Sequence, residues 1–350
     1  MPLSAYEFET LLAGRRTGLF FLKKERLQCA ITNYGARLVQ LLVPDKYGNE
    51  ANVVLGYAAL QQYRQLPEDY MGAVVGRCAN RIAGAAFDLD GRHYQLVPNE
   101  GPNLLHSGPE GLHSRVWQVM AHSETSLTLG YLSPDGEGGF PGTLNVTVTY
   151  QLETAGVLSI HYTAVAAAAT IVNLSHHAYF NLSGAGSRTA MDHYLQLPAQ
   201  YITPVDEALI PTGALMPVAG TPFDFRQAKP IGQDVAADHR QLRYGHGYDH
   251  NFVLEGKGMK QALSLWSPVS GIRLQLFTDQ PGLQFYSGNY LDGSRTGIGG
   301  QALEYRSALA LEPQHFPDAV HHPGFPSVVL QPPSVFESTS RYLFDVAEAP

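Results

Sequence analysis

The stretch LNVTVTY, residues 144–150, alternates apolar and polar side chains with a period of two. A β-strand with one buried face requires such alternation, because successive side chains of a strand point to opposite sides. Residues 126–129, 158–162 and 272–277 repeat the pattern, and turn-forming residues separate these segments. The pattern therefore predicts a fold built from many short strands.

The connections between these segments also indicate an antiparallel arrangement. In FDLDGRHYQL, residues 87–96, an Asp-Gly pair separates two short β-prone runs, which is the strongest short-range signal for a hairpin. Helical patterns are few, and we expect only short helices near residues 58–64 and 227–237. The alternation of strands with long helices that is typical of a parallel α/β fold is missing from the sequence.

The composition agrees with strands and turns. Among 350 residues there are 35 Gly, 23 Pro, 19 Tyr and 15 Phe, while charged residues make up 15%. Long helices tolerate little Gly or Pro, whereas turns use both. No linker-like tract divides the chain, so we expect residues 1–350 to form a single all-β domain. At this length we predict an extended sandwich of two large twisted antiparallel sheets.

The charge balance and the chain start argue against several classes of partner. Lys and Arg number 23 against 31 Asp and Glu, a net charge of −8, and no basic run occurs, which argues against a nucleic-acid partner. No secretory signal pattern and no apolar stretch long enough for a membrane span is found. We therefore expect a cytoplasmic protein without a membrane partner, whose Cys29 and Cys78 are small core residues rather than a disulfide.

Several segments gather polar and aromatic residues in a way that solvated surfaces do not. They cover residues 76–82, 103–117, 172–182, 247–254, 281–290 and 309–318. Taken singly, each polar residue also has a structural interpretation. Glu312 at a strand end suits an ion pair with Arg306, Asp249 suits a turn, and His106 and His177 suit hydrogen-bonded core positions.

The sequence lacks the signatures of cofactor and metal enzymes. The adjacent His176 and His177 would point to opposite faces of a strand, so they cannot both bind one ion. No zinc-type spacing, G-x-S-x-G elbow or phosphate-cradling glycine loop occurs. We therefore expect no metal and no cofactor. Carboxylate, imidazole, amide and aromatic groups together suit a sugar, whose hydroxyls need donors and acceptors and whose apolar face packs on aromatic rings.

Taken together, these segments resemble the aldose 1-epimerase (galactose mutarotase) family. The motifs that carry the resemblance are ITNYGARL, GRCANRI, NLLHSGPEGLHSRVW, SPDGEGGFPGTLNVTVTY, VNLSHHAYFNL, GYDHNFVL, PGLQFYSGNYLDG and LEPQHFPDA, in family order. The resemblance runs from about residue 30 to residue 344. It implies an antiparallel β-supersandwich that holds the sugar in an open cleft on one sheet.

The resemblance also implies roles for particular residues. Glu312 matches the general base for the anomeric hydroxyl, and His177 matches the general acid for the ring oxygen. The remaining positions match residues that hold the sugar or line its pocket: Asn80, Arg81, His106, Ala178, Tyr179, Asp249 and Gln284. The chain departs from the family pattern at His176, where Asn is usual, and at Ser107, where Gly is usual.

The function that this resemblance implies is the interconversion of α and β anomers of free hexoses such as galactose and glucose, by a monomer or a homodimer. Three alternatives stay open at this point. A carbohydrate-binding protein without activity would use the same aromatic and amide groups. A glycoside hydrolase or lyase would need a second carboxylate, for which Asp249 is the candidate beside Glu312. An epimerase for another sugar or a phosphorylated sugar is the third.

Overall fold

The computed structural model describes residues 3–350, and within them it contains strands β1 to β29, one α-helix and several short 3-10 helices. The largest sheet has nine antiparallel strands in the order β12-β13-β14-β15-β29-β25-β24-β19-β22. Their bounds are β12 Gln118–His122, β13 Ser126–Ser133, β14 Leu144–Glu153, β15 Val157–Ala166, β29 Val335–Val346, β25 Ile272–Thr278, β24 Lys260–Trp266, β19 Tyr194–Gln196 and β22 Lys229–Pro230.

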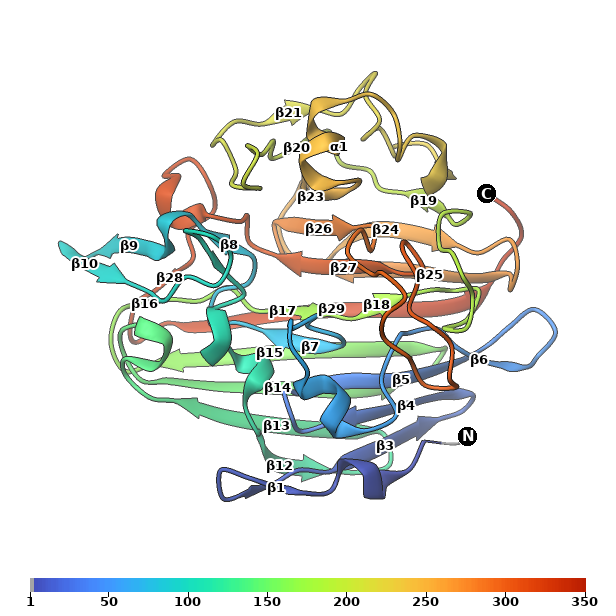
Figure 1. The fold of residues 1–350 in the computed structure, drawn as a ribbon, viewed down its shortest axis with the longest axis horizontal. Helices are drawn as coiled ribbons and strands as arrows, with labels where there is room; N and C mark the ends of the chain where they lie inside the picture. The colour runs from blue at the N-terminus through green and yellow to red at the C-terminus, as the bar shows by residue number, and fades with distance from the viewer. Residues whose placement is uncertain (1–2) are drawn as a thin grey trace.

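A second layer faces this sheet and is assembled from smaller sheets. A six-stranded sheet has the order β18-β27-β26-β23-β20-β21, a four-stranded sheet runs β3-β4-β5-β6, and β7 pairs with β17. Their bounds are β18 Tyr179–Phe180, β27 Leu309–Gln314, β26 Gly282–Tyr286, β23 Asp249–Val253, β20 Tyr201–Ile202, β21 Met216–Pro217, β3 Leu19–Lys24, β4 Leu27–Thr32, β5 Arg37–Pro44, β6 Glu50–Asn52, β7 Ala73–Val75 and β17 Ser175–His177. In Figure 1 the strands of both layers run across the view, with α1 and β21 at the top.

Short pairs and 3-10 turns complete the described chain. The strand pairs are β1 Leu11–Leu12 with β2 Arg15–Arg16, β9 Ala86–Leu89 with β10 Arg92–Gln95, β8 Arg81–Ile82 with β11 Leu104–Leu105, and β16 Thr170–Ile171 with β28 Val329–Leu330. The helix is α1 Arg240–Gly245, and the 3-10 turns are η1 Ala5–Phe8, η2 Leu60–Arg64, η3 Ala83–Ala85, η4 Gly108–Glu110, η5 Leu112–Ser114, η6 Glu137–Gly139, η7 Ile231–Gln233 and η8 Ala319–His321.

The main hydrophobic core fills the space between the two layers. One continuous cluster combines Val146 and Val148 of β14 with Leu309 and Leu311 of β27. At the other end of the layers, β3 packs against β13 and β14, and β5 packs against β29. Because each strand sends alternate side chains into this core, the opposite side chains of the second layer are free to form a site. The predicted two-layer antiparallel β fold is confirmed.

The local predictions can be compared one by one. The LNVTVTY stretch lies in β14, and the Asp-Gly pair forms the turn between β9 and β10, with positive φ at Asp90 (51°) and Gly91 (74°) as a type I′ turn requires. The predicted helix at residues 58–64 is the 3-10 turn η2.

The expectation of a helix over residues 227–237 is wrong. Strand β22 and the 3-10 turn η7 form there instead, because the amides of Ile231 and Gly232 donate to the backbone carbonyls of His193 and Met191 and not to a helix of their own. The α-helix α1 begins after this segment.

Two further observations bear on the class of protein. Cys29 and Cys78 are both buried and free, as the sequence predicts. Among residues 3–350, none of the helices has the length and apolar character that crossing a bilayer demands.

Candidate active site

The regular strands β23, β26 and β27 form the floor of a cavity. On β27 the side chains of Leu309 and Leu311 enter the core, so Glu312 between Leu311 and Pro313 faces the other way. The register pairs Gln284 with Glu312 and Asp249 with Tyr286. Three adjacent strands thus bring polar side chains to one face, and we call Asp249, Tyr286 and Glu312 the cavity floor.

Above this floor lies a cavity of about 350 Å³, a volume typical of small-molecule sites. Its lining includes seven of the residues that the sequence predicted. They are Asn80, Arg81, His106, His177, Tyr179, Asp249 and Glu312. Segments that are far apart in the sequence therefore meet in one place.

Glu312 and His177 face each other at the bottom of the cavity. The Glu312 Oε1 and His177 Nε2 atoms are 3.7 Å apart, and the two side chains are only 3% and 7% exposed. Burial raises the pKa of Glu312 well above its usual value, the charge of Asp249 adds to this, and Arg81 opposes it. Burial also lowers the pKa of His177 to about 4. Burial therefore disfavours the charged form of both groups.

His106 is held in one tautomer by the backbone. Its Nδ1 accepts a hydrogen bond from the amide of Asn80 at 3.1 Å, and its ring stands edge-on to His177 with centroids 5.3 Å apart. Burial lowers the pKa of His106 well below its usual value, and the neighbouring His177 and Arg81 add to this effect. The ring is neutral, so its proton lies on Nε2, where it can be donated to a ligand.

The same tautomer bears on whether a metal could bind here. One ligand atom each of His106, His177 and Glu312 lie within 4.8 Å of one another, a spacing that a metal ion could use. Since Nδ1 of His106 already accepts from Asn80, coordination through Nε2 would require removal of the remaining ring proton. The arrangement fits a hydrogen-bonded ligand better than a metal ion.

Arg81 lies between two carboxylates. Its Nε and Nη2 donate to the two oxygens of Glu100 at 2.5 and 2.7 Å. Its Nη1 is 3.9 Å from Asp249 Oδ2, which is longer than a hydrogen bond. Asp249 is held in turn by Gln284, whose Nε2 donates to Oδ1 at 2.6 Å. A donor and an acceptor, Arg81 and Asp249, therefore both face the cavity.

Two of the predicted residues do not line the cavity. Ala178 lies between His177 and Tyr179 on the chain, so its side chain points the opposite way and is packed in the core between the layers. Gln284 is buried behind Asp249 and contacts it rather than the cavity. The prediction that Ala178 lines the pocket is corrected accordingly, and Gln284 supports the site through Asp249.

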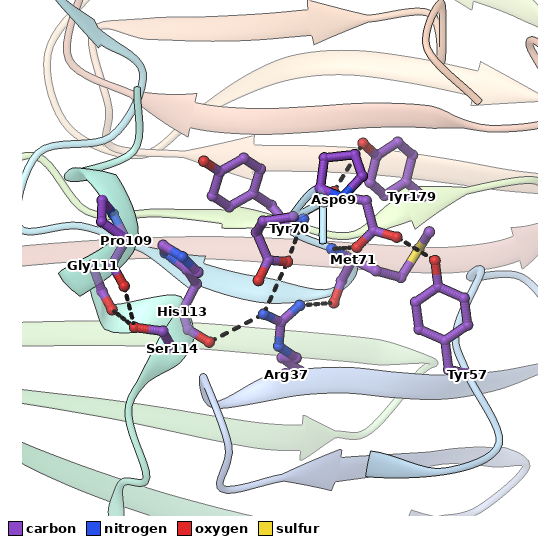
Figure 2. A network of polar contacts seen from close by, with 12 residues as sticks. Arg37, Tyr57, Asp69, Tyr70, Met71, Pro109, Gly111, His113, Ser114 and Tyr179 are labelled. Atoms are coloured by element: carbon purple, nitrogen blue, oxygen red, sulfur yellow. Dashed lines mark hydrogen bonds and ion pairs between the residues drawn. The ribbon is translucent and has the colours of Figure 1, made fainter. Parts of the chain in front are cut away.

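The sequence did not predict one side of the cavity, which we call the cavity wall and define as residues 67–70 and the connection 287–308. Asp69 Oδ2 accepts from Arg295 Nη1 at 2.7 Å and from the Tyr57 hydroxyl. Figure 2 shows Asp69 and Tyr57 joined in this way, next to Tyr70 and Tyr179. Ion pairs and hydrogen bonds between distant segments thus hold the wall.

A buried arginine anchors the wall from below. Arg37 donates to the carbonyls of Met71 and His113 at 2.9 and 3.1 Å, and Figure 2 shows both contacts. It also pairs with Glu68 at 3.2 Å. A fully buried guanidinium needs such partners, and these bind residues 67–71 to β5.

Three residues that line the cavity have left-handed backbone conformations. They are Tyr70 (φ 55°), Asn80 (φ 62°) and His106 (φ 50°). For residues other than glycine this conformation costs about 1 kcal/mol or more, and such strain gathers at functional sites. The surrounding contacts must hold these residues in place, and the Tyr70 ring does lie against His106 at 4.6 Å between centroids.

Both departures from the family pattern have a structural explanation. Ser107 has φ 66°, a conformation that favours glycine, and its hydroxyl compensates by bonding to the amide and carbonyl of Cys78 at 2.8 and 3.2 Å. His176 points away from the cavity, as strand alternation predicts, and packs edge-on against Tyr150 of the opposite layer at 5.8 Å. Burial lowers the pKa of His176 to about 3, so it stays neutral.

On one face of a β sandwich, a buried acid–base pair lies beside hydrogen-bond donors and acceptors. This arrangement defines a class of enzyme that moves protons on a small polar ligand. The family model of aldose 1-epimerase matches residues 19–343. The chain belongs to the aldose 1-epimerase family and is an isomerase.

Individual relatives agree with this assignment. The chain is 43% identical to galactose mutarotase from Rattus norvegicus, with 94% of each chain covered. It is 39% identical to aldose 1-epimerase from Escherichia coli, with 90% of this chain and 91% of the relative covered. A solved GalM/aldose epimerase homologue from C. elegans superposes with a TM-score of 0.88 at 32% identity, covering 95% of this chain and 100% of that one.

Proposed function

We propose that this chain interconverts the α and β anomers of free aldoses, with galactose and glucose as substrates, by opening and reclosing the sugar ring. The observation that carries the proposal is the buried pair of Glu312 and His177, whose facing atoms are 3.7 Å apart. In a cyclic aldose, the anomeric hydroxyl oxygen and the ring oxygen are bonded to the same carbon. A base and an acid that serve these two oxygens must therefore be close neighbours, and the pair has that spacing.

In the opening step, the Glu312 carboxylate removes the proton of the anomeric hydroxyl while protonated His177 donates to the ring oxygen. The bond between C1 and the ring oxygen breaks, and C1 becomes an aldehyde. Rotation about C1–C2 followed by reclosure, with both groups in reversed roles, gives the other anomer. After opening, Glu312 is protonated and His177 neutral, which is the state that burial favours. Proton transfer by a positioned side chain raises the reaction rate by a factor of about 10² to 10⁴ per group.

Other residues hold the sugar in this proposal. Arg81 and His106 donate hydrogen bonds to its oxygens and stabilise negative charge that develops on them. Asp249 accepts from a hydroxyl, with Gln284 behind it, and Asn80 and Tyr179 complete the contacts. The neutral tautomer of His106 supports this role, because its Nε2 proton is free to be donated.

The charges around the cavity favour an uncharged sugar over a phosphorylated one. Six acidic residues line it against two arginines, Arg81 and Arg295; the acidic residues are Glu68, Asp69, Glu100, Asp249, Asp292 and Glu312. Both arginines are already paired with carboxylates. A phosphate in this cavity would meet net negative charge, so we propose free hexoses as the substrates.

Polarimetry of freshly dissolved α-galactose and α-glucose tests the proposal. The wild-type protein should accelerate mutarotation, and Glu312→Gln and His177→Asn should each lower kcat by about 10²-fold or more while the fold is retained. Glu153→Gln, which alters a carboxylate paired with Arg341 outside the cavity, is the matched control. Binding of sugar without faster mutarotation would identify a carbohydrate-binding protein, and full activity of Glu312→Gln would refute the assigned base.

A further inference from the structure

Arg81 owes its orientation to a residue to which no role has been assigned. The guanidinium of Arg81 offers five N–H donors in a rigid plane. Two of them meet both oxygens of Glu100, at 2.5 Å from Nε and 2.7 Å from Nη2. Such a two-pronged contact fixes the plane of the guanidinium as well as its position.

This contact leaves one edge of the guanidinium for a ligand. Nη1 of Arg81 lies on the side of Asp249, 3.9 Å from Oδ2. Donor and acceptor are too far apart to bond directly, and their separation allows a single hydroxyl to bond to both. Without the fork on Glu100, the guanidinium could turn and close this gap by pairing with Asp249.

Glu100 is itself held in a tight turn. Its amide donates to the carbonyl of Asn103 at 3.1 Å, and the Asn103 amide donates back at 3.0 Å. The turn leads directly into β11, which pairs with β8, so that Leu105 lies opposite Arg81. The guanidinium is therefore carried by one strand of a short antiparallel pair, and the carboxylate that orients it is carried by the turn that leads into the other strand.

The exposure of Glu100 distinguishes it from the acid–base pair. Its side chain is 37% exposed and lies at the mouth of the cavity, whereas that of Arg81 is 6% exposed and that of Glu312 is 3% exposed. Glu100 is thus placed to act on how the sugar is held, with little direct effect on the reacting atoms.

We propose that Glu100 is a positioning residue that orients Arg81 so that Arg81 and Asp249 together bind one sugar hydroxyl. This inference rests on the proposed function. In this proposal Glu100 acts on sugar affinity through Arg81, whereas Glu312 and His177 act on the proton transfer.

The test measures sugar affinity separately from the reaction. Glu100→Ala and the isosteric Glu100→Gln are compared with wild type by polarimetry and by calorimetric titration with 1,5-anhydrogalactitol, which lacks the anomeric hydroxyl and cannot react. Because a misplaced charged hydrogen bond costs roughly a factor of ten in affinity, we expect KM and the Kd of this probe to rise about tenfold in Glu100→Ala. The effect in Glu100→Gln should be smaller, and kcat should change less than KM in both.

A double-mutant cycle separates positioning from a general structural role. Lysine cannot form the fork, so in an Arg81→Lys background Glu100→Ala should change the probe Kd by less than about twofold. An equal rise in both backgrounds, or a lowered Tm with unchanged Kd and KM, would overturn the proposal.

The control Glu153→Gln has a similar exposure, 33%, and should leave Kd unchanged. Should the wild type bind the probe but not speed mutarotation, the proposed function fails while the role of Glu100 is still decided by the titration.

Discussion

The floor and the wall of the cavity are built on different principles. The floor consists of side chains on adjacent paired strands, where Glu312, Asp249 and Tyr286 have their directions set by strand alternation and register. The wall consists of two loop segments, whose positions depend on contacts such as those of Asp69 with Arg295 and Tyr57. The proton chemistry is proposed for residues on or beside the rigid floor, while the wall closes the space around the ligand.

The largest effect is expected in the pH dependence of kcat/KM, which tests whether the acid–base pair beside the floor is as isolated from solvent as the structure indicates. Burial lowers the pKa of His177 to about 4 and raises that of Glu312 above its usual range. Between the pKa of His177 and the raised pKa of Glu312 the pair holds one proton, so kcat/KM should be constant over this range. Below about pH 4 a second proton leaves no base, and kcat/KM should fall about tenfold per pH unit.

Polarimetry with the spontaneous rate subtracted, and circular dichroism at each pH to verify folding, would check this prediction. An acid limb near 6.5, the ordinary value for histidine, would show that His177 is less isolated from solvent than the structure indicates.

Weakening the wall should have an intermediate effect. Asp69→Asn keeps the shape of the side chain but removes the charge that holds Arg295, which is 19% exposed. Because the floor is untouched, we expect KM to rise roughly three- to tenfold with kcat nearly unchanged. Initial rates over a range of galactose concentrations would measure both.

Asp224→Asn, which weakens an ion pair with Arg226 away from the cavity, is the matched control and should change neither constant. A loss confined to kcat in Asp69→Asn would mean that the wall takes part in the chemistry.

The smallest effect on activity is expected for a substitution of His176, whose side chain points away from the cavity. His176 precedes His177 on β17 but faces the core and Tyr150, and neither of its ring nitrogens has a hydrogen-bond partner within residues 3–350. His176→Asn should therefore change kcat/KM by less than about twofold, with a shift in stability of about 1 kcal/mol. Thermal unfolding and polarimetry on the same preparation would check both, and a tenfold loss of activity would show that the two histidines are coupled.

The difference between floor and wall also explains what the sequence could predict. The alternation in residues 144–150 and the Asp-Gly turn depend on near neighbours in the chain, so the strands and the β9–β10 hairpin were predictable. The floor residues lie in motifs that the family resemblance covers. Ala178 was misassigned because the resemblance named a run of three residues, while a strand turns its middle side chain to the other face.

The wall could not be predicted, because the ion pair that joins its two segments links Asp69 to Arg295, more than two hundred positions away. No local pattern encodes such a pair. The one available signal was the acidic pair Glu68-Asp69 in a chain with few charges. The sequence does not show that Arg37 and Arg295 are the partners of these two carboxylates, so the pair alone does not predict a wall.

Strand β27, which carries Glu312, is buried at all six positions and lies between β18 and β26. Segments of this kind open only when the whole molecule unfolds, whereas loops open locally at much lower free energy. The loops of the cavity wall can therefore fluctuate while β27 stays in place. The proposed base then keeps the alignment that it acquires during folding, and this alignment does not have to be rebuilt in each turnover.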